Sequence, residues 1–169
     1  MSSQRIQSIL SIFTSRLDTL GHLLVRAEET FKEASFLQRR LAPDMAPFGT
    51  QIAYTCNQPR NFALWAQGRP ADNLDPDVVS IEQARIFVRE TQALLAQVSS
   101  EDSKLAERTR IDLAPGLYAQ MTGHEYVDDF LVPNFYFHLV TAYGILRMSG
   151  VAIGKRDYMQ HLLPLVRQA

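Results

Sequence analysis

Asn134 and His138 are the polar pair in this sequence whose types and spacing could do chemistry. They lie four residues apart inside the most apolar and aromatic run of the chain, residues 133–147. On a helix, side chains at this spacing share one face. An imidazole can act as a general acid or base or as a metal ligand, and an amide can hold a neighbouring group by hydrogen bonds. We therefore place the candidate site on a helix around His138.

Asp44 is the third candidate, and it has two interpretations. It lies in the segment 41–48, which has the composition of a helix start because Pro43 and Pro47 both suit a first helical turn. A carboxylate in a first turn is favoured by the helix dipole, which would make Asp44 purely structural. If its side chain instead points into the protein, Asp44 could serve as a metal ligand or as an acid or base. The residues alone leave both interpretations open.

The amino-acid composition argues against several kinds of partner and location. The 169 residues include 17 basic and 18 acidic side chains, for a formal net charge of -1. This balance lacks the basic excess of proteins that bind nucleic acids or anionic membranes, so we expect neither partner. The single cysteine, Cys56, excludes an internal disulfide, and the N-terminus has no signal-peptide pattern. We expect a cytoplasmic protein of one domain, residues 1–169.

Two amphipathic patterns in the first half of the chain predict long helices. The first runs over residues 6–31, with apolar residues at alternating steps of four and three and with Ser2 or Ser3 as its cap. The second starts with Pro43 or Pro47 in its first turn and is broken or kinked at Pro59, because proline removes a helical hydrogen bond. A short continuation after Pro59 ends near Gly68.

Two more helices are predicted in the second half. The third follows a capping box at residues 80–83, and the fourth follows another at residues 122–125. The fourth is kinked or restarted at Pro133 and stops at Gly150. In residues 108–121, polar and apolar side chains alternate before a turn at residues 114–116, and the chain after the turn could pair back. This pattern predicts a small hairpin inserted before the last helix. Together the patterns predict an all-α protein, a four-helix bundle.

Three motifs resemble a known family. RLAPDM at residues 40–45, PNFYFH at residues 133–138 and the closing residues 142–158 are similar to an uncharacterised branch of the DinB/YfiT-like superfamily, known as a domain of unknown function. The resemblance covers nearly the whole chain. It implies an up-down-down-up four-helix bundle with a long connection between the second and third helices, and it implies homodimers.

The resemblance also bears on metal binding. Many DinB-like proteins are described as candidate metal-dependent enzymes, some of them acting in thiol transfer or small-molecule isomerisation. Their metal is held by three histidines, two of them four residues apart on the last bundle helix and one near the start of the second. Here His138 matches the second of the pair, Asn134 stands in the place of the first, and Asp44 is the match on the second helix.

This substitution of ligands changes the expected chemistry. Imidazole and carboxylate bind zinc or nickel, whereas an amide oxygen is a weak ligand for these metals. We therefore expect no cofactor. The alternative is a divalent metal held loosely by Asp44, Asn134 and His138.

Three functions remain open. In the first, which we adopt because structural networks are commoner than active sites, Asp44, Asn134 and His138 form a buried hydrogen-bond network between helices. In the second, the protein is a metal-dependent DinB-like enzyme of the thiol transferase or isomerase type, or more broadly a transferase or hydrolase, with His138 and Asp44 as catalytic candidates. In the third, aromatic side chains line a pocket in the bundle for a small-molecule ligand: Trp65, Phe135, Tyr136, Phe137 and Tyr143. A homodimer is compatible with all three.

Overall fold

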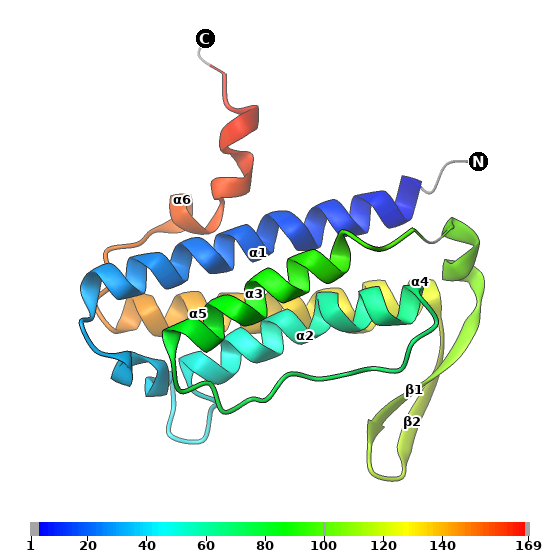
Figure 1. Cartoon of the computed structure of the whole chain (residues 1–169), viewed down its shortest axis with the longest axis horizontal. Helices are drawn as coiled ribbons and strands as arrows, with labels where there is room; N and C mark the ends of the chain where they lie inside the picture. The colour runs from blue at the N-terminus through cyan, green and yellow to red at the C-terminus, as the bar shows by residue number, and fades with distance from the viewer. Residues whose placement is uncertain (1–3, 100, 168–169) are drawn as a thin grey trace.

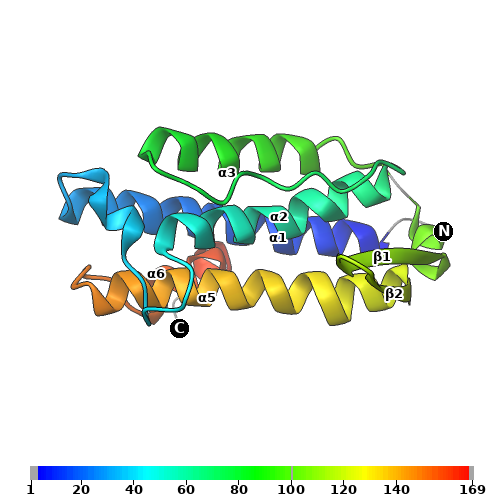
Figure 2. The same ribbon diagram turned by 90° about the horizontal axis from the view of Figure 1, so that it is seen from below.

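The structure is a computed structural model that describes residues 4–99 and 101–167, so the predicted caps Ser2 and Ser3 lie outside it. The described chain is mostly helical. Its long helices are α1 (Gln4–Thr30), α2 (Phe48–Ala66), α3 (Ile81–Leu95) and α5 (Val132–Met148). They lie side by side, with α2 and α3 running one way and α1 and α5 the other (Figures 1 and 2). Within the described residues, none of the helices has the length and apolar character that crossing a membrane requires.

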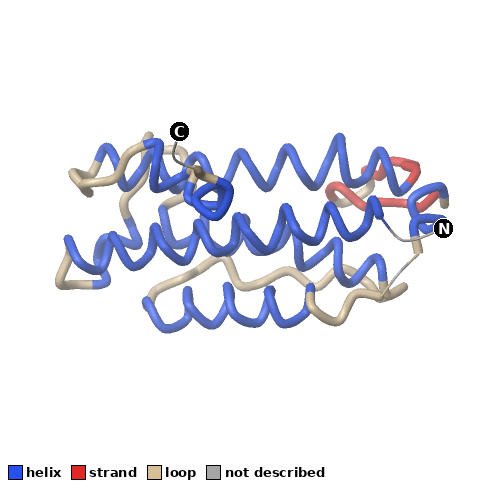
Figure 3. The backbone as a smooth tube through the Cα atoms, turned by 90° about the horizontal axis from the view of Figure 1, so that it is seen from above, coloured by secondary structure: helices blue, strands red, loops and turns tan. Residues whose placement is uncertain are grey.

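Short elements join and extend these helices. Figure 3 shows that the strands lie at one end of the molecule and that the helices make up its body. The short helical segments are η1 (Ala34–Gln38), η2 (Asp102–Ala106), α4 (Gly123–Glu125), η3 (Tyr126–Leu131), α6 (Lys155–Tyr158) and η4 (Gln160–Leu165).

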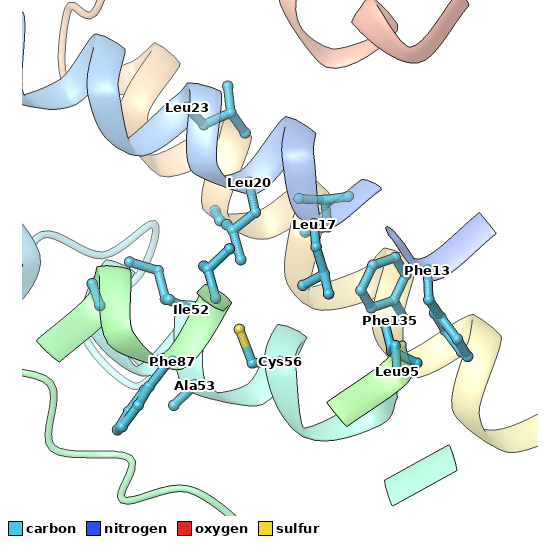
Figure 4. Packing of buried hydrophobic residues seen from close by; sticks show 14 of the residues in the cluster. Phe13, Leu17, Leu20, Leu23, Ile52, Ala53, Cys56, Phe87, Leu95 and Phe135 are labelled. Carbon is cyan, nitrogen blue, oxygen red and sulfur yellow. The ribbon is translucent and has the colours of Figure 1, made fainter. Parts of the chain in front are cut away.

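The core forms where the apolar faces of the long helices meet. Phe13 of α1 lies near its middle, with its ring centroid 5.7 Å from that of Phe62 in α2 and 5.1 Å from that of Phe135 in α5. Burying one phenylalanine side chain stabilises a fold by about 1.5–3 kcal/mol. Cys56 of α2 is fully buried among residues of α1 and α3 (Figure 4). Six of the eight apolar positions predicted to alternate along α1 are buried: Ile6, Phe13, Leu17, Leu20, Leu24 and Ala27. The other two, Leu10 and Phe31, are half-buried, and Phe31 follows the end of the helix.

Helix α2 begins at Phe48 with Pro47 as its N-cap, which is the later of the two starts that the sequence allows. The chain before it forms a turn, in which the Met45 N–H donates to the carbonyl of Ala42 at 3.0 Å. The helix then continues through Pro59, so the predicted break there is wrong. Pro59 removes one backbone hydrogen bond, and packing of the buried helix on all its neighbours outweighs that loss.

The predicted hairpin is confirmed. Strands β1 (Arg108–Ala114) and β2 (Leu117–Thr122) pair antiparallel, with Arg108 opposite Thr122. Gly116 has φ +77° in the turn between them, a conformation that favours glycine. The hairpin projects from one end of the helical body, beside the end of α2 (Figure 1).

The last long helix is a rod built from α4, η3 and α5. The predicted capping box starts it: the Glu125 N–H donates to the Thr122 hydroxyl at 3.2 Å, and the Thr122 N–H donates to the Glu125 carboxylate at 2.7 Å. The segment η3 is a π-helix, and Pro133 follows it in the first turn of α5. Gly150, with φ +92°, ends the rod as predicted.

Candidate functional site

A cleft of about 590 Å³ lies between α2, the η3–α5 segment, strand β1 and the connection that follows α2. His138 and Asn134 both line it, so the structure brings together the pair whose spacing placed them on one face. Five side-chain amides line the walls: Asn57, Gln58, Asn61, Asn73 and Asn134. Aromatic rings line them as well: Tyr54, Trp65, Tyr126 and Phe130.

The π-helix explains how one side of a long rod keeps facing the cleft. Tyr126, Phe130, Asn134 and His138 follow each other at steps of four, and all four line the cleft. On an α-helix such steps drift around the axis, because one turn has about 3.6 residues. The wider π turn has more residues per turn and offsets that drift. The segment η3 therefore holds Tyr126 and Phe130 in line with His138.

His138 is held by one hydrogen bond that fixes its tautomer. Its Nδ1 lies 2.8 Å from Oε1 of Gln51 in α2. The amide nitrogen of Gln51 donates to the carbonyl of Ala46 at 3.0 Å, and that carbonyl can only accept. The oxygen of Gln51 therefore faces His138, and Nδ1 carries the proton. Gln51 does not line the cleft, so the opposite edge of the ring, with the lone pair of Nε2, faces it.

The surroundings of His138 keep the ring neutral. Burial lowers the pKa of His138 from 6.5 to about 4, because a charged imidazole loses hydration there. The ring of Tyr54 lies 5.1 Å away and that of Phe137 lies 5.3 Å away, centroid to centroid. At neutral pH, Nε2 is thus an unprotonated nitrogen that can accept a hydrogen bond or take up a proton.

Asn134 turns part of its amide back onto its own helix. Its Nδ2 donates to the carbonyl of Phe130 at 2.9 Å. This bond orients the side chain and leaves Oδ1 as the atom for other partners. Asn134 and His138 together therefore present an oxygen acceptor and a nitrogen acceptor on one wall of the cleft.

Asp44 does not join them, and the predicted network is wrong in this respect. Asp44 is exposed in the turn before α2 and is not among the residues that line the cleft. The physical reason is the late start of α2 at Phe48, which leaves Asp44 outside the helix. The partner of His138 is instead Gln51, one turn inside α2.

Of the five aromatic residues predicted to line a pocket, the cleft contains Trp65. Its indole N–H donates to the Thr109 hydroxyl of β1 at 3.4 Å. Phe135 is buried in the core, and Phe137 is exposed beside the His138 ring without lining the cleft. Tyr54 and Phe130 line the cleft but were not predicted from the sequence. A helical spacing could have indicated them, because Tyr54 lies four residues before Gln58 and Phe130 lies four residues before Asn134. The remaining two pack elsewhere: Tyr136 against Phe135 and Tyr143 against Tyr158.

The donors in the cleft do not fit a firmly held transition metal. His138 supplies one nitrogen, and Asn134 supplies an amide oxygen, which is a weak ligand for zinc or nickel. Asp112 is the acidic residue that lines the cleft, and Arg110 already donates to it at 2.9 Å. Across the described residues, no group of three or more His, Cys, Asp and Glu side chains is placed to hold a metal ion.

Comparison with known proteins places the chain in a family. Residues 7–159 match the model of a domain of unknown function, DUF1993. The chain belongs to this family. It is also similar in structure to a DinB family member protein from Shewanella denitrificans, with a TM-score of 0.76 and 28% sequence identity over 89% of this chain and 88% of that chain. No curated protein matches the chain.

These findings confirm the resemblance to an uncharacterised DinB-like branch. The DUF1993 match spans every residue that lines the cleft, from Tyr54 to His138. The candidate site therefore lies inside the DUF1993 domain and not in an extension of it.

Proposed function

We propose that this DUF1993 protein binds a small, uncharged polar molecule in the cleft, with Nε2 of His138 accepting a hydrogen bond from it. One observation carries the proposal: Nδ1 of His138 is bonded to Gln51, which lies outside the cleft, while His138 itself lines the cleft.

The chemistry of the walls indicates the class of ligand. Side-chain amides both donate and accept hydrogen bonds and carry no charge, which suits a neutral molecule with donors and acceptors of its own. Oδ1 of Asn61 is buried and has no hydrogen-bond partner among the described residues. A buried acceptor without a partner costs about 1–3 kcal/mol, which a donor on the ligand would offset. The cleft volume of about 590 Å³ lies within the usual range for small-molecule sites.

The charges at the cleft favour an uncharged ligand. Arg110 donates to Asp112, and Arg69 donates to the side-chain oxygen of Gln67 at 3.3 Å. These cations are already engaged by protein oxygens, so neither is reserved for an anionic ligand. An anion would have to compete with Asp112 for Arg110.

Trp65 offers a direct test, because it is the single tryptophan of the chain and lines the cleft. A panel of neutral heteroaromatic and polyhydroxylated compounds would be screened by Trp65 fluorescence and by thermal shift. We expect at least one compound to change both signals in the wild type and to lose at least tenfold in affinity with His138→Gln. His124→Gln is the matched control, since His124 is exposed and does not line the cleft. Equal affinity in the wild type and His138→Gln would contradict the proposal.

A metal-dependent DinB-like enzyme, of the thiol transferase or isomerase type, is the second candidate function. Its support is the structural similarity to a DinB family member protein and the free Nε2 of His138. In this proposal His138 and Asp44 hold the metal, which requires Asp44 to leave its exposed turn. Elemental analysis of untagged protein, purified without chelator, tests it. Stoichiometric metal that disappears with His138→Ala would support the enzyme and count against the binding role described above.

We further propose that α1, α2, α3 and α5 constitute the up-down-down-up four-helix bundle of DinB-like proteins, and that the chain forms homodimers. The directions of the helices in Figure 1 support the first part. Support for the second part comes from the resemblance to DinB-like proteins and from the exposed apolar side chains Phe137, Val140 and Met148 of α5.

A further inference from the structure

Most of the side-chain amides that line the cleft are turned the same way by the protein. Gln58 of α2 donates its Nε2 to the carbonyl of Tyr54 at 3.1 Å, and Asn134 of α5 donates its Nδ2 to the carbonyl of Phe130 at 2.9 Å. A backbone carbonyl can only accept, so in both side chains the amide oxygen is left for other partners. Neither oxygen has a hydrogen-bond partner among the described residues.

Asn61 and His138 add two more acceptors. Nδ2 of Asn61 donates to Oδ1 of Asn73 at 2.9 Å, and Oδ1 of Asn61 is buried without a partner in the described chain. His138 contributes the unprotonated Nε2. Asn57 is turned the other way, because its Oδ1 accepts the Leu74 N–H at 2.8 Å and its Nδ2 is left to donate. The amides and the imidazole therefore offer four acceptors and two donors, the donors being Asn57 and the exposed Asn73.

The acceptors and the aromatic rings are separated along the cleft. Near β1, the ring of Trp65 lies 5.8 Å from that of Tyr126, which stacks on Phe130 at 5.9 Å. At the other end, the ring of Tyr54 lies 5.1 Å from that of His138. The amides of α2 and α5 line the cleft as well. A bound molecule therefore meets an aromatic wall at the hairpin end and hydrogen-bond acceptors beyond it.

We propose that the ligand of the cleft is a neutral heteroaromatic ring that carries an amino group, an inference that rests on the proposed function and names its class of ligand. The N–H groups of such a molecule donate to the free acceptors of Gln58, Asn134 and His138. A ring nitrogen next to the amino group accepts from Nδ2 of Asn57. The flat ring packs against the aromatic wall, as rings do in offset or edge-to-face contact.

Other classes of ligand fit these walls less well. A ring that carries oxo groups would set its oxygens against amide oxygens, and acceptors buried without donors cost free energy. A polyhydroxylated compound can donate through every hydroxyl but has no flat face for the aromatic wall. A protonated amine would bring a charge to a place where burial lowers the pKa of His138 to about 4. The carboxylate that lines the cleft, Asp112, is already paired with Arg110.

Matched pairs of nucleobases test the proposal on the full chain. Adenine and hypoxanthine share one ring system, cytosine and uracil share another, and in each pair an oxo group replaces the amino group. Isothermal titration calorimetry would measure each Kd. We expect the amino member of at least one pair to bind at least about tenfold more tightly than its oxo partner.

A substitution at Gln58 tests whether the acceptors produce this preference. Gln58→Met keeps the length of the side chain and removes its amide, so the preference for the amino compound should fall at least about threefold. Gln92→Met is the matched control, since Gln92 is a half-buried residue of α3 that does not line the cleft. Its preference should equal that of the wild type, and circular dichroism would check that both variants are folded. An unchanged preference in Gln58→Met would overturn the proposal.

The remaining outcomes separate this inference from the proposed function. Oxo compounds that bind as tightly as their amino partners, with affinity still lost in His138→Gln, would overturn the class of ligand and leave the binding role of the cleft in place. The same holds if neither amino compound binds while another neutral compound binds through His138. Tighter binding of benzylamine, which is protonated at neutral pH, would overturn both, since the ligand would then be charged.

Discussion

His138 should make the stability of this protein depend on pH between 7 and 5. Its pKa is about 4 in the folded protein and near 6.5 when the ring is in water. Between these values the unfolded chain binds a proton that the folded chain does not. The free energy of unfolding therefore falls as the pH is lowered through 6.5 towards 4, and the contribution is fully present above pH 6.5.

The size of the effect follows from the two pKa values. Linkage gives a loss of about 2 kcal/mol between pH 7 and pH 5 for a shift of this size, as an upper value because His138 is only partly buried. For a chain of this length, that corresponds to a drop in melting temperature of about 4–8 °C. Asp102, Glu125 and Asp157 have pKa values lowered by their hydrogen bonds, so their contributions are lost mainly below about pH 5.

Urea unfolding at pH 7 and pH 5, followed by circular dichroism, would measure this loss in the wild type and in His138→Gln. Glutamine keeps a hydrogen-bond partner for Gln51 and removes the titrating ring. We expect the variant to lose about 1–2 kcal/mol less than the wild type between the two pH values. Equal losses in the two proteins would refute the conclusion that burial keeps His138 neutral.

Three further predictions concern the scaffold of the site. Gly123→Ala should lower the melting temperature by several degrees, because the added Cβ would lie 2.6 Å from the ring of Trp65 and 2.7 Å from the Cα of Leu105; an unchanged melting curve would count against this close packing. Cys56 should react with a thiol reagent only at the rate of unfolding, since it is fully buried and burial raises its pKa to about 12, and fast labelling in native buffer would contradict this. Thr122→Ala should destabilise the protein by about 1 kcal/mol in urea titrations, through loss of the capping box; no loss would mean that the box is dispensable.

Local patterns in the sequence were sufficient for most of the fold. The capping box at Thr122, the N-cap at Ser80, the stop at Gly150 and the hairpin are found as predicted, because each depends on residues close together in the chain. At Ser80 the predicted box is only half formed, since the Gln83 side chain accepts from the Val79 N–H. The alternating apolar steps of α1 likewise predicted its buried face. The DinB-like resemblance also came from short motifs, of which PNFYFH lies in α5 and RLAPDM lies before α2.

The site was predicted only in part, because it depends on contacts between distant residues. Asn134 and His138 were found from their spacing on one helix. Their surroundings could not be, since Gln51 is 87 residues from His138 in the chain and carries no motif. Asp44 was misplaced because two prolines, Pro43 and Pro47, are equally suited to a helix start, and tertiary packing selects the second.

The state of one imidazole tests the central claim most directly. Long-range proton–nitrogen NMR correlation on uniformly ¹⁵N-labelled protein at pH 7 would show which nitrogen of His138 carries the proton, with assignment by loss of the signals in His138→Gln. We predict a protonated Nδ1 and an unprotonated Nε2, the state in which Gln51 presents the lone pair to the cleft. A proton on Nε2, or a ring charged at both nitrogens, would contradict the account.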